Sequence, residues 1–196
     1  MARRKARQTR IKRTKPLFVI STEGRNTERI YFESFKPGRD GTFRIEVLPN
    51  TRDKSSPKDV INRLLVAATD RRTIETHVEY WAVLDRDAWP EEQLSESWRK
   101  IRDRENFFFS MSNPCFELWL YLHLCDNKPF TDRRDCQKEL EKLTGKDVKC
   151  SGFDPQLFVL KVHDAIDRAK LLDENPKEPW PTKQGSRVYR LVESLW

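Results

Sequence analysis

The chain has 196 residues, the size of one ordinary domain or of one domain with an appendage. Hydrophobic residues make up 37% and charged residues 35%, yet the apolar residues gather in short runs that favour a packed core over a disordered chain. No run approaches the roughly 18 apolar residues of a membrane span. No apolar segment follows the basic start as in a secretory signal, so we expect a cytoplasmic protein without membrane contact.

The formal charge of +7 arises in the first 15 residues. They include eight basic residues and no acid, whereas the rest of the chain has 30 basic and 31 acidic residues. Residues 1–15 lack the apolar side chains needed to fold and are predicted to form a disordered tail. Such a polycation either binds the phosphates of RNA or DNA or only keeps the protein in solution. Its candidate nucleic-acid-binding residues are Arg3, Arg4, Lys5, Arg7, Arg10, Lys12 and Arg13.

Strand and helix patterns alternate after the tail. Residues 80–84 (YWAVL) form a continuous apolar run, which is typical of a central strand buried on both faces. Residues 43–47 alternate between apolar and charged side chains, as a strand does. The predicted order is strand 17–20, helix 26–36, strand 43–47, a helix from 57, strand 80–84, helix 90–104 and strand 106–110.

Asn113 and Pro114 are predicted to start the next helix, with Asn113 as its N-cap and Pro114 at its first position. Further helices are predicted over 131–143, 155–172 and 185–195. Alternation of strands and helices indicates an α/β fold in which helices flank a mostly parallel sheet. The predicted organisation is a basic tail over 1–15, an α/β core over 16–125 and a helical C-terminal elaboration over 126–196 packed on the core.

Three acids follow two of the predicted strands. Glu23 comes after the first strand, and Asp85 and Asp87 come after the third. Ligands of open α/β sheets bind outside the carboxyl ends of the strands, and residues i and i+2 of an extended segment point to the same side. The three carboxylates are therefore candidate ligands of Mg²⁺, which prefers such oxygens. Acids at strand ends also cap helices or hold turns, and this alternative stays open.

Several motifs together resemble the RloB-like family. The strand ends with Glu23 and Asp85 also look like the Toprim domain of topoisomerases, primases and OLD-type nucleases. The resemblance covers nearly all of residues 16–196. The motifs that carry it are EGRNTERIYF at 23–32, DRD at 85–87, SNPCFELW at 112–119 with His123, and VYRLV at 188–192.

The resemblance implies a Mg²⁺-dependent Toprim-like nuclease, with Mn²⁺ as a substitute for Mg²⁺. RloB-like genes lie beside restriction loci, so the implied role is antiphage defence, and this context also permits toxic RNA cleavage during infection. By the same resemblance Glu23 transfers protons or binds metal, and Asp85 and Asp87 hold Mg²⁺. All three acids keep the family's pattern.

Glu117 and His123 are further catalytic candidates. Glu117 stands among apolar residues and needs a partner; it is either a fourth acidic ligand or the partner of a nearby arginine. His123 is either a general acid, because the pKa of histidine lies near neutrality, or a hydrogen-bonded residue of the core. Arg25, two residues from Glu23, is a candidate contact for the scissile phosphate.

Two classes of function follow. The first is a metal-dependent phosphodiesterase acting on RNA or DNA. The second is a non-catalytic nucleic-acid-binding module, or a regulatory subunit whose partner protein is encoded at the same defence locus. The second class predicts that loss of residues 1–15 is more severe than Asp85→Asn, and the first class predicts the reverse.

Overall fold

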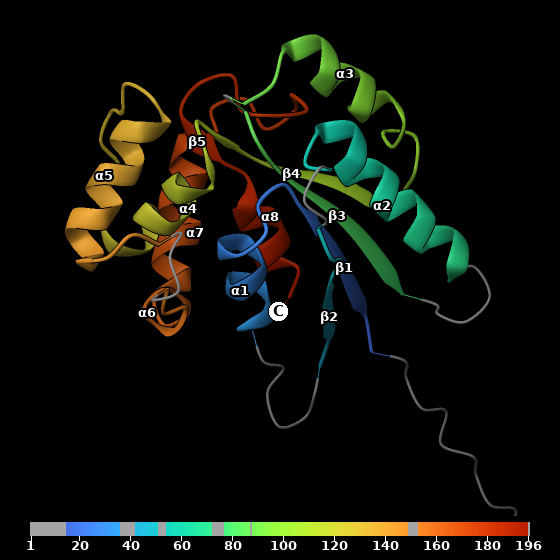
Figure 1. Cartoon of the computed structure of the whole chain (residues 1–196), viewed down its shortest axis with the longest axis horizontal. Helices are drawn as coiled ribbons and strands as arrows, with labels where there is room; N and C mark the ends of the chain where they lie inside the picture. Colours follow the sequence, from blue (N-terminus) through green and yellow to red (C-terminus); the bar gives the residue numbers. More distant parts are fainter. Residues whose placement is uncertain are drawn as a thin grey trace, which may run out of the picture.

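A mostly parallel sheet forms the centre of the computed structural model, which describes residues 15–35, 42–50, 54–71, 77–86, 88–148 and 153–195 (Figure 1). Within these residues the sheet has five strands in the order β2-β1-β3-β4-β5. The first four are parallel, and β5 runs antiparallel to β4. The strands are β1 (Leu17–Thr22), β2 (Arg44–Val47), β3 (Val78–Asp85), β4 (Phe107–Asn113) and β5 (Gly185–Ser186).

Helices cover both faces of the sheet, which confirms the predicted α/β fold (Figure 1). One face packs against α2 (Pro57–Asp70) and α3 (Glu91–Arg99). The other face packs against α1 (Thr27–Glu33), α4 (Phe116–Leu124) and α8 (Val188–Glu193). Three further helices pack against α4: α5 (Arg133–Thr144), α6 (Gln156–Val159) and α7 (Val162–Leu172).

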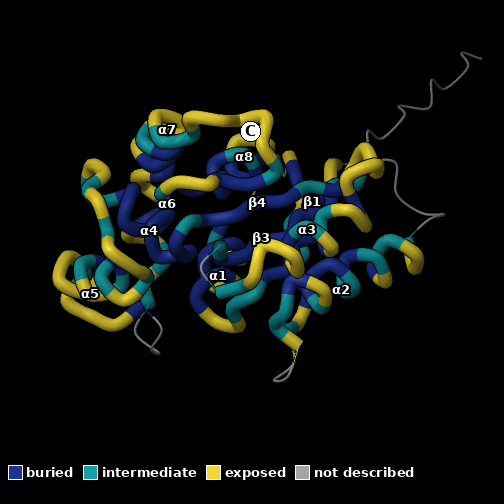
Figure 2. Tube along the Cα trace, turned by 90° about the horizontal axis from the view of Figure 1, so that it is seen from above, coloured by how far each residue is buried: buried dark blue, intermediate teal, exposed yellow. Residues whose placement is uncertain are grey.

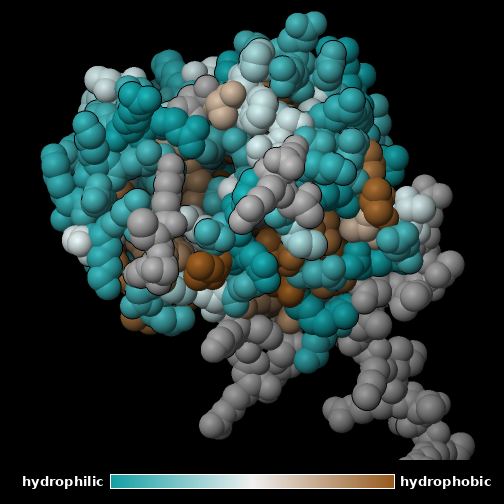
Figure 3. Space-filling view, viewed as in Figure 1, coloured by the Kyte–Doolittle hydropathy of each residue, from teal (hydrophilic) through white to brown (hydrophobic). Residues whose placement is uncertain are grey.

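Alternate side chains of each strand enter different cores. In β1, Phe18 and Ile20 pack on the side of α1 and α4, whereas Leu17 and Val19 pack on the side of α2 and α3. Both faces are therefore buried, as Figure 2 shows for β3 and β4, and this explains the continuous apolar runs in the sequence. Hydrophilic side chains dominate the surface seen in Figure 3.

The start of α4 differs from its prediction. Asn113 is the last residue of β4 rather than a helix cap, the Asn113–Pro114 peptide is cis, and Cys115 is the N-cap. The side-chain amide of Asn113 donates instead to the carbonyls of residues 181–183. The N–H of Phe116, in the first turn of α4, donates to the carboxylate of Asp85. The carboxylate of Asp85, at the end of β3, thus has the capping role that was predicted for the side chain of Asn113.

Three other predicted helices are shorter or divided. The helix predicted over 90–104 ends at Arg99, and that over 155–172 is split into α6 and α7. The helix predicted over 185–195 begins only at Val188, because Gly185 and Ser186 pair with β4. Arg187, 1% exposed, is fixed by an ion pair with Asp173 at 2.8 Å. Long-range pairing here overrides local helix preference.

The domain division and the tail stay predictions. Among residues 1–15 the structure describes only Lys15. Within the described ranges no helix is both long enough and apolar enough to cross a membrane. The candidate tail residues outside the described part are Arg3, Arg4, Lys5, Arg7, Arg10, Lys12 and Arg13.

Candidate active site

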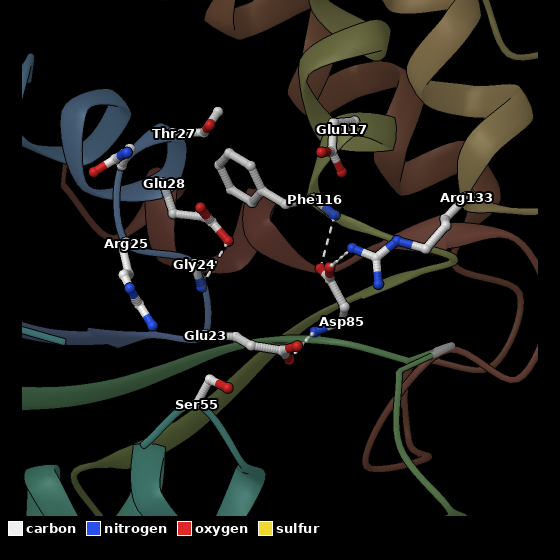
Figure 4. Close-up of a pocket in the computed structure, with 11 residues that line it drawn as sticks. Glu23, Gly24, Arg25, Thr27, Glu28, Ser55, Asp85, Phe116, Glu117 and Arg133 are labelled. Carbon is white, nitrogen blue, oxygen red and sulfur yellow. Dashed lines mark hydrogen bonds and ion pairs between the residues drawn. The ribbon is translucent and has the colours of Figure 1, made fainter. Parts of the chain in front are cut away.

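A cavity of about 360 Å³ lies at the carboxyl edge of the sheet (Figure 4). β1 and β3 are parallel neighbours, with Thr22 opposite Val83, so the residues that follow them emerge side by side. Two arginines, Arg25 and Arg133, also line the cavity. The acids that line it are Glu23, Glu28, Asp85 and Glu117.

Glu23 turns its carboxylate toward the end of β3. Its Oε2 accepts a hydrogen bond from the indole N–H of Trp89 at 2.9 Å and from the backbone N–H of Asp85 at 3.3 Å. Its own backbone N–H donates to the carbonyl of Val83 at 3.0 Å, which continues the β1–β3 ladder past the strand end. Glu23 is thereby held beside Asp85.

Arg63 of α2 fixes the backbone in front of Glu23. Its guanidinium donates to the Ser21 hydroxyl at 3.0 Å and to the Thr22 carbonyl at 2.7 Å. The amide of Asn50 adds a bond of 2.6 Å to the carbonyl of Glu23 itself. The turn that carries the first acid is therefore clamped from the α2 side of the sheet.

Asp85, the last residue of β3, is 6% exposed and has a protein partner on each oxygen. Oδ1 accepts the backbone N–H of Phe116 at 2.8 Å, and Oδ2 accepts Nη2 of Arg133 at 3.2 Å. Burial, followed by repulsion from Glu23, raises the pKa of Asp85 well above its ordinary value, while Arg133 acts in the opposite direction. The two donors therefore offset only part of the cost of burying this acid.

Glu28 of α1 folds its carboxylate back onto the loop after β1. Its Oε1 accepts the backbone N–H of Gly24 at 3.0 Å. A Cβ at position 24 would lie 1.9 Å from Oε2 of Glu28, so any side chain there would displace this carboxylate. Burial, with repulsion from Glu117 and Glu23, raises the pKa of Glu28 to about 7. Glu28 therefore binds a proton much more readily than an exposed glutamate does.

Glu117 lies in the first turn of α4 and is 5% exposed. Its Oε1 accepts a hydrogen bond from the side-chain amide of Gln137 at 3.0 Å. Its charge contributes to the raised pKa values of both Glu28 and Asp85. The structure thus joins Glu117 electrostatically to the acids at the strand ends.

His123 lies in the core and is not among the residues that line the cavity. Its Nδ1 lies 2.8 Å from the carbonyl of Trp119, and because a carbonyl only accepts, Nδ1 carries the proton. Nε2 then accepts the hydroxyl of Tyr31 at 3.0 Å. Burial lowers the pKa of His123 to about 4, so the ring is neutral. This is the hydrogen-bonded core position that was the alternative to a catalytic role.

Two candidates remain, Arg25 and Asp87. Arg25 is exposed and lines the cavity, whereas Asp87 lies outside the described residues. Among the residues that are described, no three His, Cys, Asp or Glu side chains are arranged as a ready metal site. The donor chemistry nevertheless fits a hard divalent cation, because the cavity presents carboxylate oxygens whose mutual repulsion is incompletely compensated.

Two charged residues that line the cavity, Glu28 and Arg133, were absent from the sequence candidates. Glu28 had a recognisable signal: with Tyr31 and Phe32 it occupies positions i, i+3 and i+4, so it belongs to the buried face of its helix. Arg133 had no such signal, since it meets Asp85 across 48 residues of sequence. Both now belong to the set of residues that control charge in the cavity.

Comparison with known proteins adds one finding. The family model described as RloB-like protein matches residues 18–195, which is nearly the whole chain. No curated protein and no solved structure matches the chain.

Arg63→Met should lower the free energy of unfolding by about 1–3 kcal/mol, because it removes the guanidinium donors to the buried Ser21 hydroxyl and Thr22 carbonyl. Urea denaturation at pH 7 measures this. Lys58→Met, on an exposed position of the same helix, is the matched control and should change stability by less than about 0.5 kcal/mol. Equal losses of unfolding free energy in the two variants would show that the contacts of Arg63 do not stabilise this turn.

Glu28→Gln should make stability less dependent on pH. The pKa of Glu28 rises from 4.5 to about 7 in the folded protein, so its stabilising contribution is complete below pH 4.5 and is lost as the pH rises through 7. Glutamine mimics the protonated acid and keeps an acceptor for Gly24. The variant should match the wild type at pH 4.5 and exceed its unfolding free energy by about 2–3 kcal/mol at pH 8.

Urea denaturation at both pH values tests this expectation. Glu33→Gln removes a half-exposed acid from the same helix and should show no comparable gain at pH 8. A constant difference between wild type and Glu28→Gln across the pH range would show that Glu28 does not titrate in this window.

Proposed function

Because the chain belongs to the RloB-like family, we propose that it is a Mg²⁺-dependent Toprim-like phosphodiesterase that cleaves RNA or DNA in antiphage defence. The observation that carries the proposal is the meeting of four acids, from the loop after β1 and from α1, β3 and α4, in one cavity at the carboxyl edge of the sheet. Two of these acids, Glu28 and Asp85, have raised pKa values. Acids with strongly shifted pKa values concentrate at functional sites. Mn²⁺ is the proposed substitute for Mg²⁺.

In this proposal Glu23 and Asp85, together with Asp87, hold the cation. A bound divalent cation supplies a water of lowered pKa and charge that stabilises the developing phosphorane. Glu28, whose pKa of about 7 suits proton transfer near neutral pH, accepts or returns a proton. Arg25, exposed at the cavity wall, contacts the phosphate, and the basic tail raises the local concentration of nucleic acid.

A second candidate is a non-catalytic nucleic-acid-binding or regulatory subunit of a defence system. The contacts of Asp85 favour it, because Phe116 and Arg133 already give each carboxylate oxygen a protein donor. In that case Asp85 serves as the cap of α4, the acids have a structural role, and nucleic acid is bound by residues 1–15.

Cleavage assays with the purified full chain distinguish the two functions. The wild type is incubated with Mg²⁺ or Mn²⁺ and with tRNA, total RNA, single-stranded DNA or plasmid, beside Glu23→Gln and Asp85→Asn. Each variant should lose activity by at least about 100-fold, because each removes a ligand charge. EDTA should abolish cleavage by the wild type.

Two further proteins serve as controls. Glu91→Gln changes an acid that is largely exposed outside the cavity and should retain activity. Deletion of residues 1–15 should weaken binding in a salt-dependent way but leave cleavage at saturating substrate. Cleavage retained by both acid variants would refute the assignment of the site. Binding without cleavage, lost with residues 1–15 and kept in Asp85→Asn, would support the non-catalytic function.

A further inference from the structure

One face of α5 is directed at the acids of the cavity. Arg133, the first residue of the helix, donates to Oδ2 of Asp85 at 3.2 Å. Gln137, one turn later, donates to Oε1 of Glu117 at 3.0 Å. Residues four apart share a helix face, so α5 brings a cation and an amide to two acids at once. Figure 4 shows the side chain of Arg133 reaching across to Asp85.

Buried contacts hold α5 in this position. Cys136 and Leu140 on the same helix are both 0% exposed and belong to the core that includes α4. Asp132 caps the helix by accepting the N–H of Asp135 at 2.9 Å, which fixes the first turn that carries Arg133. The approach of Arg133 to Asp85 is therefore built into the packing of α5 on α4.

The two partners of the ion pair differ in exposure. The side chain of Asp85 is 9% exposed, whereas that of Arg133 is 35% exposed and lines the cavity. Asp85 also keeps the N–H of Phe116 on its other oxygen. The guanidinium is consequently the more exposed partner of the pair, and the carboxylate is the buried one with a donor on each oxygen.

We propose that Arg133 exchanges partners during the reaction. In the cation-free protein it neutralises Asp85. When a divalent cation binds Asp85, Arg133 binds a phosphate of the nucleic acid instead. This inference rests on the proposed function, since it requires a cation at Asp85. A guanidinium and a divalent cation repel each other at one carboxylate oxygen. The displaced guanidinium is matched in geometry to a phosphate, which it binds through two parallel N–H groups.

The first test is a calorimetric Mn²⁺ titration of the full chain without nucleic acid. Arg133→Gln should bind Mn²⁺ about threefold to tenfold more tightly than the wild type, because a competing cation is removed. Arg134→Gln is the matched control: it removes the same charge from the neighbouring, exposed position of α5 and should leave the affinity unchanged. If Arg133→Gln only damaged the structure around the cavity, Mn²⁺ would not bind more tightly.

The outcomes separate this inference from the proposed function. Equal or weaker Mn²⁺ binding by Arg133→Gln, with a normal circular dichroism spectrum, would overturn the exchange while leaving the metal site in place. Equal tightening in Arg133→Gln and Arg134→Gln would also overturn it, since net charge would then explain the effect. Failure of every protein to bind Mn²⁺ would refute the metal-dependent function, and the exchange with it.

The second test measures binding of a fluorescein-labelled 20-nucleotide single-stranded RNA, and of the matching DNA, by fluorescence anisotropy. Ca²⁺ replaces Mg²⁺ to limit cleavage, and EDTA gives the cation-free reference. Wild type and Arg134→Gln should bind more tightly in Ca²⁺ than in EDTA. Arg133→Gln should lose most of this gain while keeping its affinity in EDTA. An undiminished gain in Arg133→Gln would show that the guanidinium does not reach the phosphate.

Discussion

Negative charge buried at one edge of the sheet is the constraint to which the rest of the site responds. Glu28, Asp85 and Glu117 are each less than 9% exposed and lie in the same cavity as Glu23. Burial and repulsion from neighbouring acids disfavour the ionised forms of Glu28 and Asp85. The chain offsets this with backbone N–H groups of Gly24 and Phe116 and with the guanidinium of Arg133.

The order of the strands brings these acids together. Parallel pairing of β1 with β3, and of β3 with β4, places three carboxyl ends along one edge. α1 and α4 then start close to that edge, and each contributes an acid from its first turn. An acid in the first turn is favoured by the helix dipole, so each helix start tolerates its own carboxylate but adds to the charge of its neighbours.

Sequence reasoning reached the features that depend on local pattern. Burial of β1 and β3 on both faces follows from their apolar runs. Glu23 and Asp85 lie at the predicted strand ends, although Asp85 is the last residue of β3 rather than the residue after it. It failed where contacts between residues far apart in the sequence determine the local structure. Asn113 did not become the cap of α4 because Asp85 took that place, and Gly185 joined β4 instead of a helix. The pairing of Arg133 with Asp85 left no trace in spacing or composition.

Stability alone does not account for such a site. Replacing buried charged groups with apolar residues of similar volume commonly leaves a protein equally or more stable, and the surrounding core already supplies apolar neighbours such as Phe116. A single guanidinium on Asp85 leaves a net negative charge among the four acids unless protons are bound, as the raised pKa of Glu28 indicates. In the proposed function, the stronger positive charge of a divalent cation replaces both the bound protons and Arg133. These features support the proposed cation site over an arrangement in which the acids serve only as helix caps.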